Sequence, residues 1–277
     1  LLNLKAGDEV ILPSYTFVST ANAFVLRGAL PVFADIEENT LNISPQEIEK
    51  KITSKTKAIY VVHYAGVSCD MGSIMEISKN RGIPVVEDAA QGVNAKYKDK
   101  FLGAIGDIGC YSFHETKNYS CGEGGALLIN RSDLIERAEI LREKGTNRSK
   151  FFRGEIDKYT WVDIGSSYLI SEILAAHLFA QFEKMQEIQN LRKNIFYRYY
   201  NALLQYEKKE KIQLPFIPPD CQQNYHMFYI LFKTQEIRDR IMKQLKALGI
   251  LAIFHYVPLH VSDMGKKWGY KEGDFPI

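Results

Sequence analysis

The amino-acid sequence predicts an α/β fold built on a mostly parallel sheet. Short apolar runs alternate with helix-like stretches from residue 9 to residue 130, as expected when helices cover both faces of such a sheet. Hydrophobic residues form 46% of the 277 residues, so the chain can bury a large α/β core and a smaller second one. The formal net charge of +2 gives no reason to expect a nucleic acid or a charged membrane as partner.

Six strands and four helices are expected in the first half of the chain. The apolar runs predict strands at residues 9–12, 31–34, 58–62, 84–87, 109–113 and 126–130. Helices are predicted at residues 17–27, 45–51, 71–81 and 134–143. Ser44 and Pro45 give one of these helices a cap and a first-turn proline, while Gly28 and Gly82 stand where helices should end.

The second half of the chain predicts a connecting helix and a smaller unit. Apolar residues recur at helical spacing from residue 171 to about residue 206. A proline-rich loop at 214–220 precedes a predicted strand at 227–232 and a predicted helix at 234–248. We therefore expect a large α/β domain over residues 1–170, a long helix over 171–213 and a small C-terminal α+β domain over 214–277. Both ends of the natural protein are expected to lie outside this sequence.

The cysteines and histidines do not predict a disulfide or a metal site. The four cysteines are Cys69, Cys110, Cys121 and Cys221. They form no C-x-x-C pair and lie in or beside apolar stretches, which favours reduced thiols. Only His255 and His260 lie close together, without a further residue at a usual ligand spacing. With no signal peptide and no apolar run near the roughly 20 residues of a membrane helix, we expect a cytoplasmic protein.

Asp88 and Lys117 are the candidate reactive residues. Asp88 follows the predicted strand 84–87, and ligands in open α/β sheets bind just beyond the carboxyl ends of strands. Lys117 follows the strand 109–113 and precedes the glycine-rich run 122–125, where small residues permit close backbone approach. Burial there would lower the pKa of the amine and favour its attack on an aldehyde.

An amine and a carboxyl together match the needs of pyridoxal 5'-phosphate (PLP). This cofactor is held as a Schiff base by a lysine, and a carboxylate keeps its ring nitrogen protonated. The residues alone leave alternatives open, because Asp88 could cap a helix and Lys117 could be an exposed lysine. Glu87 also leaves open which of two neighbouring carboxyls faces the site.

Four other residues are candidates for the same site. Gln91 would share a face with Asp88 if residues 88–91 form one helical turn. Ser112 and His114 alternate along a strand and could both face a phosphate group. Phe17 follows the first strand and could stack on an aromatic ring, although it could equally be a core residue.

Three motifs taken together resemble the DegT/DnrJ/EryC1/StrS family of sugar aminotransferases. They are Val86-Glu87-Asp88-Ala89-Ala90-Gln91, Ser112-Phe113-His114-x-x-Lys117-Asn118 and Gly122-Glu123-Gly124-Gly125. The resemblance implies a PLP-dependent transferase of type I, the aspartate aminotransferase fold, acting as a homodimer with shared active sites. It further implies transfer of an amino group from glutamate to a nucleotide-linked keto sugar.

The resemblance also implies a role for each matching residue. Lys117 would form the Schiff base and move the proton, and Asp88 would pair with the ring nitrogen. Gln91 would bind the ring oxygen and Phe17 would stack on the ring. The expected phosphate contacts are Ser112, with His114 nearby.

Three further stretches, at residues 143–148, 159–168 and 254–260, are similar to family members that aminate dTDP-4-oxo-6-deoxyglucose. Such enzymes serve surface polysaccharides, among them lipopolysaccharide and enterobacterial common antigen. Arg148 is the expected partner of the diphosphate, and Tyr256 and His260 are expected to meet the sugar or base. As an alternative, Arg148 could be a solvated loop charge.

Three other functions remain open at this level. Transfer to the 3-keto position of the sugar is compatible with the same motifs. A related dehydratase carries histidine in place of the Schiff-base lysine, and Lys117 argues against it. An inactive sugar-nucleotide-binding relative would lack the visible absorbance of bound PLP.

Overall fold

A six-stranded sheet forms the centre of the molecule. The computed structural model describes residues 1–277. The strands are β1 (Glu9–Pro13), β2 (Leu30–Ala34), β3 (Thr56–Val62), β4 (Val85–Asp88), β7 (Ile108–Ser112) and β8 (Gly125–Ile129). Their order is β2-β1-β3-β4-β7-β8, and only β8 runs antiparallel to its neighbour. The predicted α/β fold with a mostly parallel sheet is confirmed.

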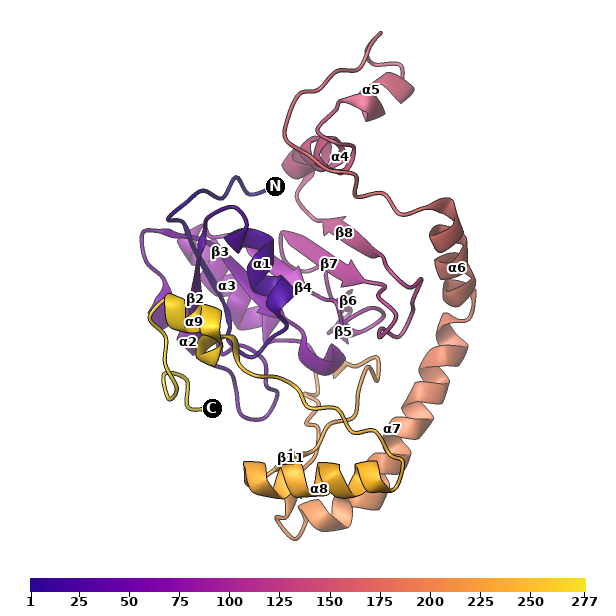
Figure 1. Cartoon of the computed structure of the whole chain (residues 1–277). Helices are drawn as coiled ribbons and strands as arrows, with labels where there is room; N and C mark the ends of the chain where they lie inside the picture. The colour runs from indigo at the N-terminus through magenta and orange to yellow at the C-terminus, as the bar shows by residue number, and fades with distance from the viewer.

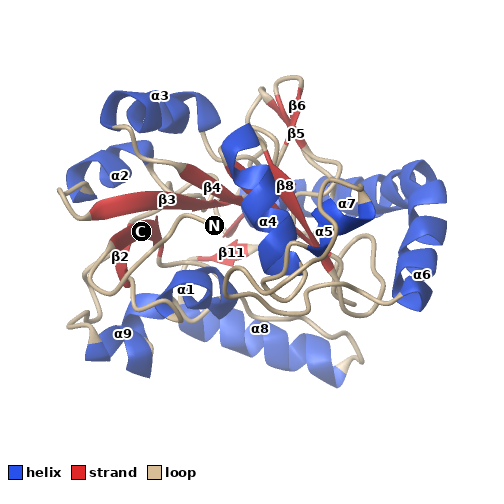
Figure 2. Ribbon diagram, turned by 90° about the horizontal axis from the view of Figure 1, so that it is seen from above, coloured by secondary structure: helices blue, strands red, loops and turns tan.

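Helices cover both faces of this sheet. Figure 2 shows α2 (Pro45–Lys51) and α3 (Met71–Arg81) on one side, and α1 (Val18–Val25) and α9 (Asp263–Lys267) on the other. Side chains of the strands alternate between two cores. Ile11 and Val61 pack with the helix residues Ile48 and Ile74 on the first side. On the second side, Val10, Leu12 and Ala58 pack with Phe24 of α1.

The predicted long helix is divided in two. The structure has α6 (Glu172–Glu183) and α7 (Met185–Glu207), separated by Lys184 at φ −102° and ψ 9°. The apolar spacing continues across the break, because Phe182 and Met185 both pack toward the cluster around Phe113 and Tyr119. Periodicity alone therefore does not reveal that the axis changes at Lys184.

The region after α7 contains few regular elements. Its own elements are β9 (Ile212–Gln213), β11 (Leu231–Phe232) and α8 (Gln235–Ala247), so only the last two residues of the predicted strand 227–232 are a strand. The short strand β10 (Cys221–Gln222) instead pairs with β5 (Lys96–Tyr97), which forms a hairpin with β6 (Lys100–Phe101).

The end of the chain returns to the large domain. Leu259 joins the core beneath α1, and the rings of Tyr270 and Phe33 lie 4.8 Å apart. Figure 1 accordingly places α9 beside β2 and α2 rather than beside α8. Short-range periodicity could not predict this return, because it depends on contacts between residues more than 200 positions apart.

Two helices follow β8 at the far end of the molecule. They are α4 (Ile135–Arg142) and α5 (Arg148–Phe152), and Figure 1 shows both at the end opposite α8. Three short 3-10 turns, 64–66, 132–134 and 259–261, complete the structure. None of the helices has both the length and the apolar character that crossing a lipid bilayer requires.

Candidate active site

The carboxyl ends of four strands meet at one edge of the sheet. β1, β3, β4 and β7 are parallel, so the loops that follow them converge there. The strand that follows β1 in sequence, β2, lies on one side of β1, and β3 lies on its other side. The strand order therefore reverses between β1 and β3, and such a topological switch point is where open α/β sheets bind ligands. Tyr15 and Tyr64, from the loops after β1 and β3, have hydroxyl oxygens 3.2 Å apart. The sheet thus places polar side chains where an α/β fold forms its crevice.

Glu87 and Asp88, the last residues of β4, point to opposite faces of the sheet. Glu87 is fully buried, and its carboxylate accepts hydrogen bonds from the amides of Gly103, Ile105 and Gly106 at 2.6–2.7 Å. His63 Nε2 lies 2.9 Å from the same carboxylate. Burial by itself would raise the pKa of Glu87, but the bonds from His63, Gly106 and Gly103 bring it below its ordinary value. Glu87 is therefore saturated with donors of the protein itself.

Asp88 lies on the α1 side and is half-buried. Thr20 of α1 donates its hydroxyl to Asp88 Oδ2 at 2.7 Å, and the Ala90 amide donates to Oδ1 at 3.1 Å. These two bonds fix the carboxyl but leave acceptor capacity on both oxygens. Of the two neighbouring carboxyls, Asp88 is the one that can bind a ligand.

Lys117 lies in the turn that follows β7. Its amide donates to the carbonyl of His114 at 2.9 Å, and its side chain is half-buried. Burial lowers the pKa of the Lys117 amine, while the charge of Asp88 acts in the opposite direction. Lys117 follows β7, which pairs with β4 in parallel, so Lys117 and Asp88 lie beyond the ends of neighbouring strands.

Gln91 has one end of its amide fixed by the backbone. Gln91 Oε1 accepts a hydrogen bond from the amide of Ala65 at 2.6 Å, which identifies the other end as the Nε2 donor. Nε2 donates to the Tyr256 hydroxyl at 3.3 Å. Ala65 has a φ of 57°, an uncommon value for alanine that brings its amide to Gln91. The site therefore presents an oriented N–H group beside Asp88.

Phe17 and Tyr256 form one wall of the site. The Phe17 side chain is 59% exposed directly before α1, and its ring centroid lies 6.5 Å from that of Tyr256. His255 stacks on Tyr256 with centroids 4.3 Å apart, and Tyr15 donates its hydroxyl to the His255 carbonyl at 2.7 Å. An exposed aromatic ring here is available to a planar ligand.

Ser112 and His114 lie on the chain between β7 and Lys117. The Ser112 hydroxyl accepts a hydrogen bond from the His114 amide at 3.4 Å, and both residues are partly exposed. His114 Nδ1 lies 3.0 Å from the Thr116 hydroxyl, and His114 Nε2 lies 3.6 Å from Glu123. The imidazole therefore has protein partners on both nitrogens, whereas the Ser112 hydroxyl can still donate.

Two predicted substrate contacts lie elsewhere in the chain. Arg148 begins α5, where its guanidinium pairs with Glu143 at 3.7 Å and stacks over Phe152. His260 is buried, and its Nδ1 lies 2.7 Å from the hydroxyl of Ser14. Through this bond His260 supports the loop that carries Phe17, so its contact with the site is indirect. Of the predicted substrate residues, only Tyr256 touches the cluster around Asp88.

The sequence did not single out several residues that the structure brings to this cluster. Asn118 binds His226, with Asn118 Oδ1 2.9 Å from His226 Nδ1, and donates to the Asn224 carbonyl at 2.8 Å. Asn224 reaches this position because Gly66, at φ +78°, leaves room that any Cβ would fill. Asn224 and His226 come from the segment after the proline-rich loop, and only their three-dimensional contacts place them beside Asn118.

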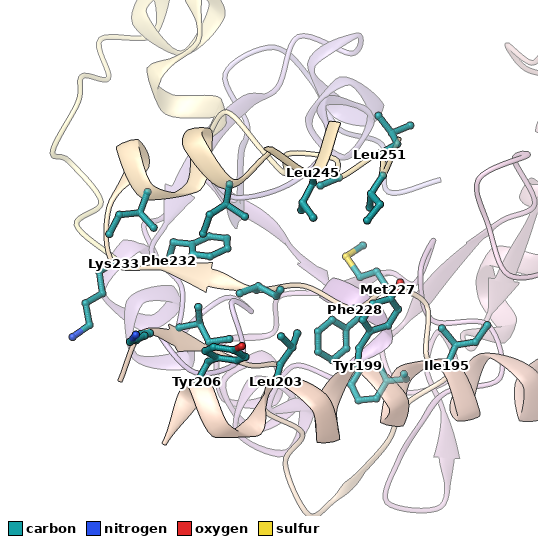
Figure 3. A pocket seen from close by; sticks show the side chains of 18 of the residues that line it. Ile195, Tyr199, Leu203, Tyr206, Met227, Phe228, Phe232, Lys233, Leu245 and Leu251 are labelled. Carbon is teal, nitrogen blue, oxygen red and sulfur yellow. The ribbon is translucent and has the colours of Figure 1, made fainter. Parts of the chain in front are cut away.

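A cavity of about 1050 Å³ lies between α7, β9, β11 and α8 (Figure 3). Its walls are mostly apolar, with Tyr199, Phe228 and Leu245 among them. Arg192 and His226 also line it, so the cavity extends toward the residues that neighbour Lys117.

The fold is that of the aminotransferases of the PLP-dependent type I class. The model of the DegT/DnrJ/EryC1/StrS aminotransferase family matches residues 1–277. This chain belongs to that family.

Individual relatives agree with this assignment. The uncharacterised protein MJ1066 of Methanocaldococcus jannaschii is 36% identical over 282 residues, covering 99% of this chain and 72% of the relative. The spore coat polysaccharide biosynthesis protein SpsC of Bacillus subtilis is 35% identical over 278 residues, covering 98% and 71%. The PLP form of the putative sugar aminotransferase Spr1654 of Streptococcus pneumoniae matches with a TM-score of 0.88 at 25% identity, covering 99% and 73%.

The cofactor of this family of sugar-nucleotide aminotransferases is PLP, and the residues present fit it. Lys117 offers an amine whose pKa is lowered by burial, next to a carboxyl with free acceptor capacity. The Nε2 group of Gln91 is directed by the Ala65 amide, and the ring of Phe17 is exposed. A lysine amine, a carboxyl, an N–H donor and an aromatic face are the groups that this cofactor requires.

Proposed function

We propose that this chain transfers an amino group from glutamate to the 4-keto carbon of dTDP-4-oxo-6-deoxyglucose. The product would be dTDP-4-amino-4,6-dideoxygalactose, an amino sugar for surface polysaccharides such as lipopolysaccharide or enterobacterial common antigen. The observation on which this proposal rests is the half-buried Lys117 amine beside the Asp88 carboxyl, in a member of this aminotransferase family. The stretches 143–148, 159–168 and 254–260 support the choice of sugar.

Each group at the strand ends has a chemical task in this proposal. PLP, when bound, supplies the electron-accepting ring that makes proton removal at the reacting carbon possible. Lys117 Nζ would hold the cofactor covalently and, when free, would carry the proton to and from the reacting carbon. Asp88 would hold a proton on the ring nitrogen, and Thr20 would keep its carboxyl in place.

Other side chains would orient the cofactor. Gln91 Nε2 would donate to the ring oxygen, because its amide is already directed by Ala65. The Ser112 hydroxyl would bind the phosphate, with His114 beside it, and Phe17 would stack on the ring.

The proposed assembly is a homodimer with shared active sites. Arg148 lies on α5, which Figure 1 places at the end of the molecule opposite α8. Arg148 can therefore bind the diphosphate only if it reaches the site of a second subunit. Tyr256, which contacts Gln91, would meet the sugar within its own subunit.

Product analysis tests the proposed substrate. Protein loaded with PLP is incubated with glutamate and a panel of dTDP- and UDP-linked keto sugars, and mass spectrometry detects the amino sugar. NMR of the product then identifies the aminated carbon. Amination of a 3-keto sugar alone would replace the 4-keto assignment, and amination of a UDP-linked sugar alone would replace dTDP.

Replacing Lys117 tests the chemistry itself. We expect Lys117→Ala to lose the visible absorbance of the bound cofactor and to lower turnover by about 10²- to 10⁴-fold, because both the covalent attachment and the proton carrier are removed. Lys79, an exposed lysine of α3, provides the matched control Lys79→Ala. Unchanged absorbance and turnover in Lys117→Ala would exclude it as the reactive lysine.

A further inference from the structure

Two of the three buried side-chain nitrogens that have no hydrogen-bond partner belong to residues near His226. They are Arg192 Nε and His255 Nδ1, and the third is Arg148 Nε. Arg192 Nη2 donates to the carbonyl of His226 at 3.1 Å, which ties the guanidinium to this segment. An unpartnered buried donor costs folding free energy, so its presence indicates a place where a ligand supplies the missing partner.

The cluster contains one permanent positive charge, that of the Arg192 guanidinium, together with two histidines. Burial lowers the pKa of His226 to about 3, and the charges of Lys117, Arg192 and His255 act in the same direction. Burial also lowers the pKa of His255, again with a contribution from Lys117. None of the ion pairs of the molecule includes Arg192, His226 or His255. Both imidazoles are therefore neutral near pH 7, and the Arg192 guanidinium, which has no paired acid, is the group that would attract an anion.

The cluster is adjacent to the reactive amine. His226 Nδ1 is 2.9 Å from the side chain of Asn118, the residue after Lys117. His255 stacks on Tyr256, whose hydroxyl meets Gln91 at the other side of the site. Arg192, His226 and His255 are each partly exposed as residues, and the first two line the cavity of Figure 3, whereas the atoms Arg192 Nε and His255 Nδ1 themselves are buried.

We propose that Arg192, His226 and His255 form the subsite for the carboxylate of the amino donor. This proposal rests on the proposed function, and it adds the group that recognises the amino acid. An α-amino acid carries its carboxylate on the same carbon as its amino group, so that carboxylate must bind within a few ångströms of the point at which Lys117 reacts. The proposed contact of the cofactor phosphate is a different residue, Ser112, which precedes Lys117 at the end of β7. Arg192 would bind the carboxylate through Nε, and His255 through Nδ1.

Direct binding of an unreactive dicarboxylate provides the first test. Glutarate has the carbon length of glutamate but no amino group, and its dissociation constant with the PLP-loaded protein is measured by titration calorimetry. We expect Arg192→Met and His255→Phe each to weaken glutarate binding by about 10-fold or more, the effect of losing one charge-assisted hydrogen bond. His255→Phe keeps the ring that stacks on Tyr256.

Matched variants control for nonspecific effects. Arg198 is an exposed arginine of α7 and His177 is an exposed histidine of α6, so Arg198→Met and His177→Phe should bind glutarate as the unmodified chain does. If Arg192→Met and His255→Phe also bind glutarate normally, the proposed subsite is wrong.

The two half-reactions separate the donor site from the sugar site. Glutamate converts PLP to its pyridoxamine form, and the keto sugar converts that form back to PLP. Each of these two reactions is followed separately by absorbance. We expect Arg192→Met and His255→Phe to raise the half-saturating glutamate concentration about 10-fold, with the sugar half-reaction changed by less than about 2-fold. Equal losses in both half-reactions, or weaker PLP binding, would instead assign the cluster to the sugar diphosphate or to the cofactor phosphate and overturn the proposal.

Failure of the proposed function is distinguishable from failure of this subsite. If the unmodified chain reacts with glutamate but aminates no dTDP-linked sugar, the sugar assignment fails and the subsite is still judged by the glutamate half-reaction. If the unmodified chain does not react with glutamate, the proposed function fails. The subsite is then judged only by whether Arg192→Met and His255→Phe weaken glutarate binding.

Discussion

The two sides of the carboxyl end of β4 show how one strand separates stability from function. On one side, the Glu87 carboxylate is fully buried and has four donors from the protein itself. On the other side, Asp88 is half-buried and has two, from Thr20 and Ala90. The residues are neighbours in sequence, yet strand geometry turns them to opposite faces. A saturated carboxylate stabilises the fold, whereas one with free acceptor capacity can serve a ligand.

The Glu87 side also fixes the backbone on which Asp88 depends. His63 Nδ1 accepts a hydrogen bond from the Cys69 amide at 3.2 Å, so His63 Nε2 carries the proton that faces Glu87. The His63 amide in turn donates to the Asp88 carbonyl at 3.2 Å. The buried network therefore holds β3 and β4 together at the place where Asp88 leaves the sheet. This arrangement predicts that the two carboxyls respond differently to the same chemical change.

Of the changes at the end of β4, Asp88→Asn is expected to have the largest effect. An amide cannot hold a proton on the cofactor ring as a carboxylate does, so we expect turnover to fall by about 10²- to 10³-fold while thermal stability changes little. The pKa of Lys117 should fall further, because the Asp88 charge raises it. Steady-state kinetics measures turnover, and the pH dependence of chemical labelling at Lys117 measures its pKa. Asp99→Asn, at an exposed turn position, is the control.

A change at Glu87 should have the opposite profile. Glu87→Gln places an amide group against backbone N–H donors, and we expect the free energy of unfolding to fall by about 2 kcal/mol. Denaturant unfolding measures this loss, with the exposed Glu76→Gln of α3 as control. The comparison between the two sides of β4 would fail if Glu87→Gln were as stable as the unmodified chain.

The pH dependence of stability provides a further test of the structural role of Glu87. The pKa of Glu87 is lower in the folded chain than its ordinary value of 4.5, so its contribution is fully present above that value. It is lost as the pH falls below 4.5 and through the folded-state pKa. We therefore expect the difference in stability between the unmodified chain and Glu87→Gln to shrink in acid.

Much of this architecture could be predicted from local sequence. The ten predicted elements between residues 9 and 143 all occur in the structure within two residues of their expected bounds, because core positions there repeat at the strand and helix periods. The motifs also indicated Asp88 and Lys117 as the reactive pair. Apart from the family resemblance, the residues alone left open the choice between Asp88 and Glu87, because it depends on which face of β4 α1 covers.

Other parts of the site depend on contacts that no local pattern encodes. Gln91 is oriented by Ala65 from a loop with an unusual dihedral angle, and His226 reaches Asn118 from more than 100 residues away. The same is true of His260, whose motif predicted a substrate contact but whose ring binds Ser14. Such pairings follow from tertiary packing, and sequence periodicity is insensitive to them.

The smallest expected effect concerns Thr20, the residue that supports Asp88 from α1. Thr20→Val keeps the shape of the side chain and removes the hydroxyl that donates to Asp88 Oδ2 at 2.7 Å. The same hydroxyl lies 2.9 Å from that of Thr16, but its bond to Asp88 is the one that bears on the cofactor. Loss of that bond, worth about 1 kcal/mol, should weaken PLP binding by roughly 5-fold, with a small loss of turnover. Ser19→Ala, at the preceding exposed position of the same helix, should leave PLP binding unchanged. Fluorescence titration with PLP measures both, and equal affinities for Thr20→Val and Ser19→Ala would mean that the Ala90 amide alone suffices to orient Asp88.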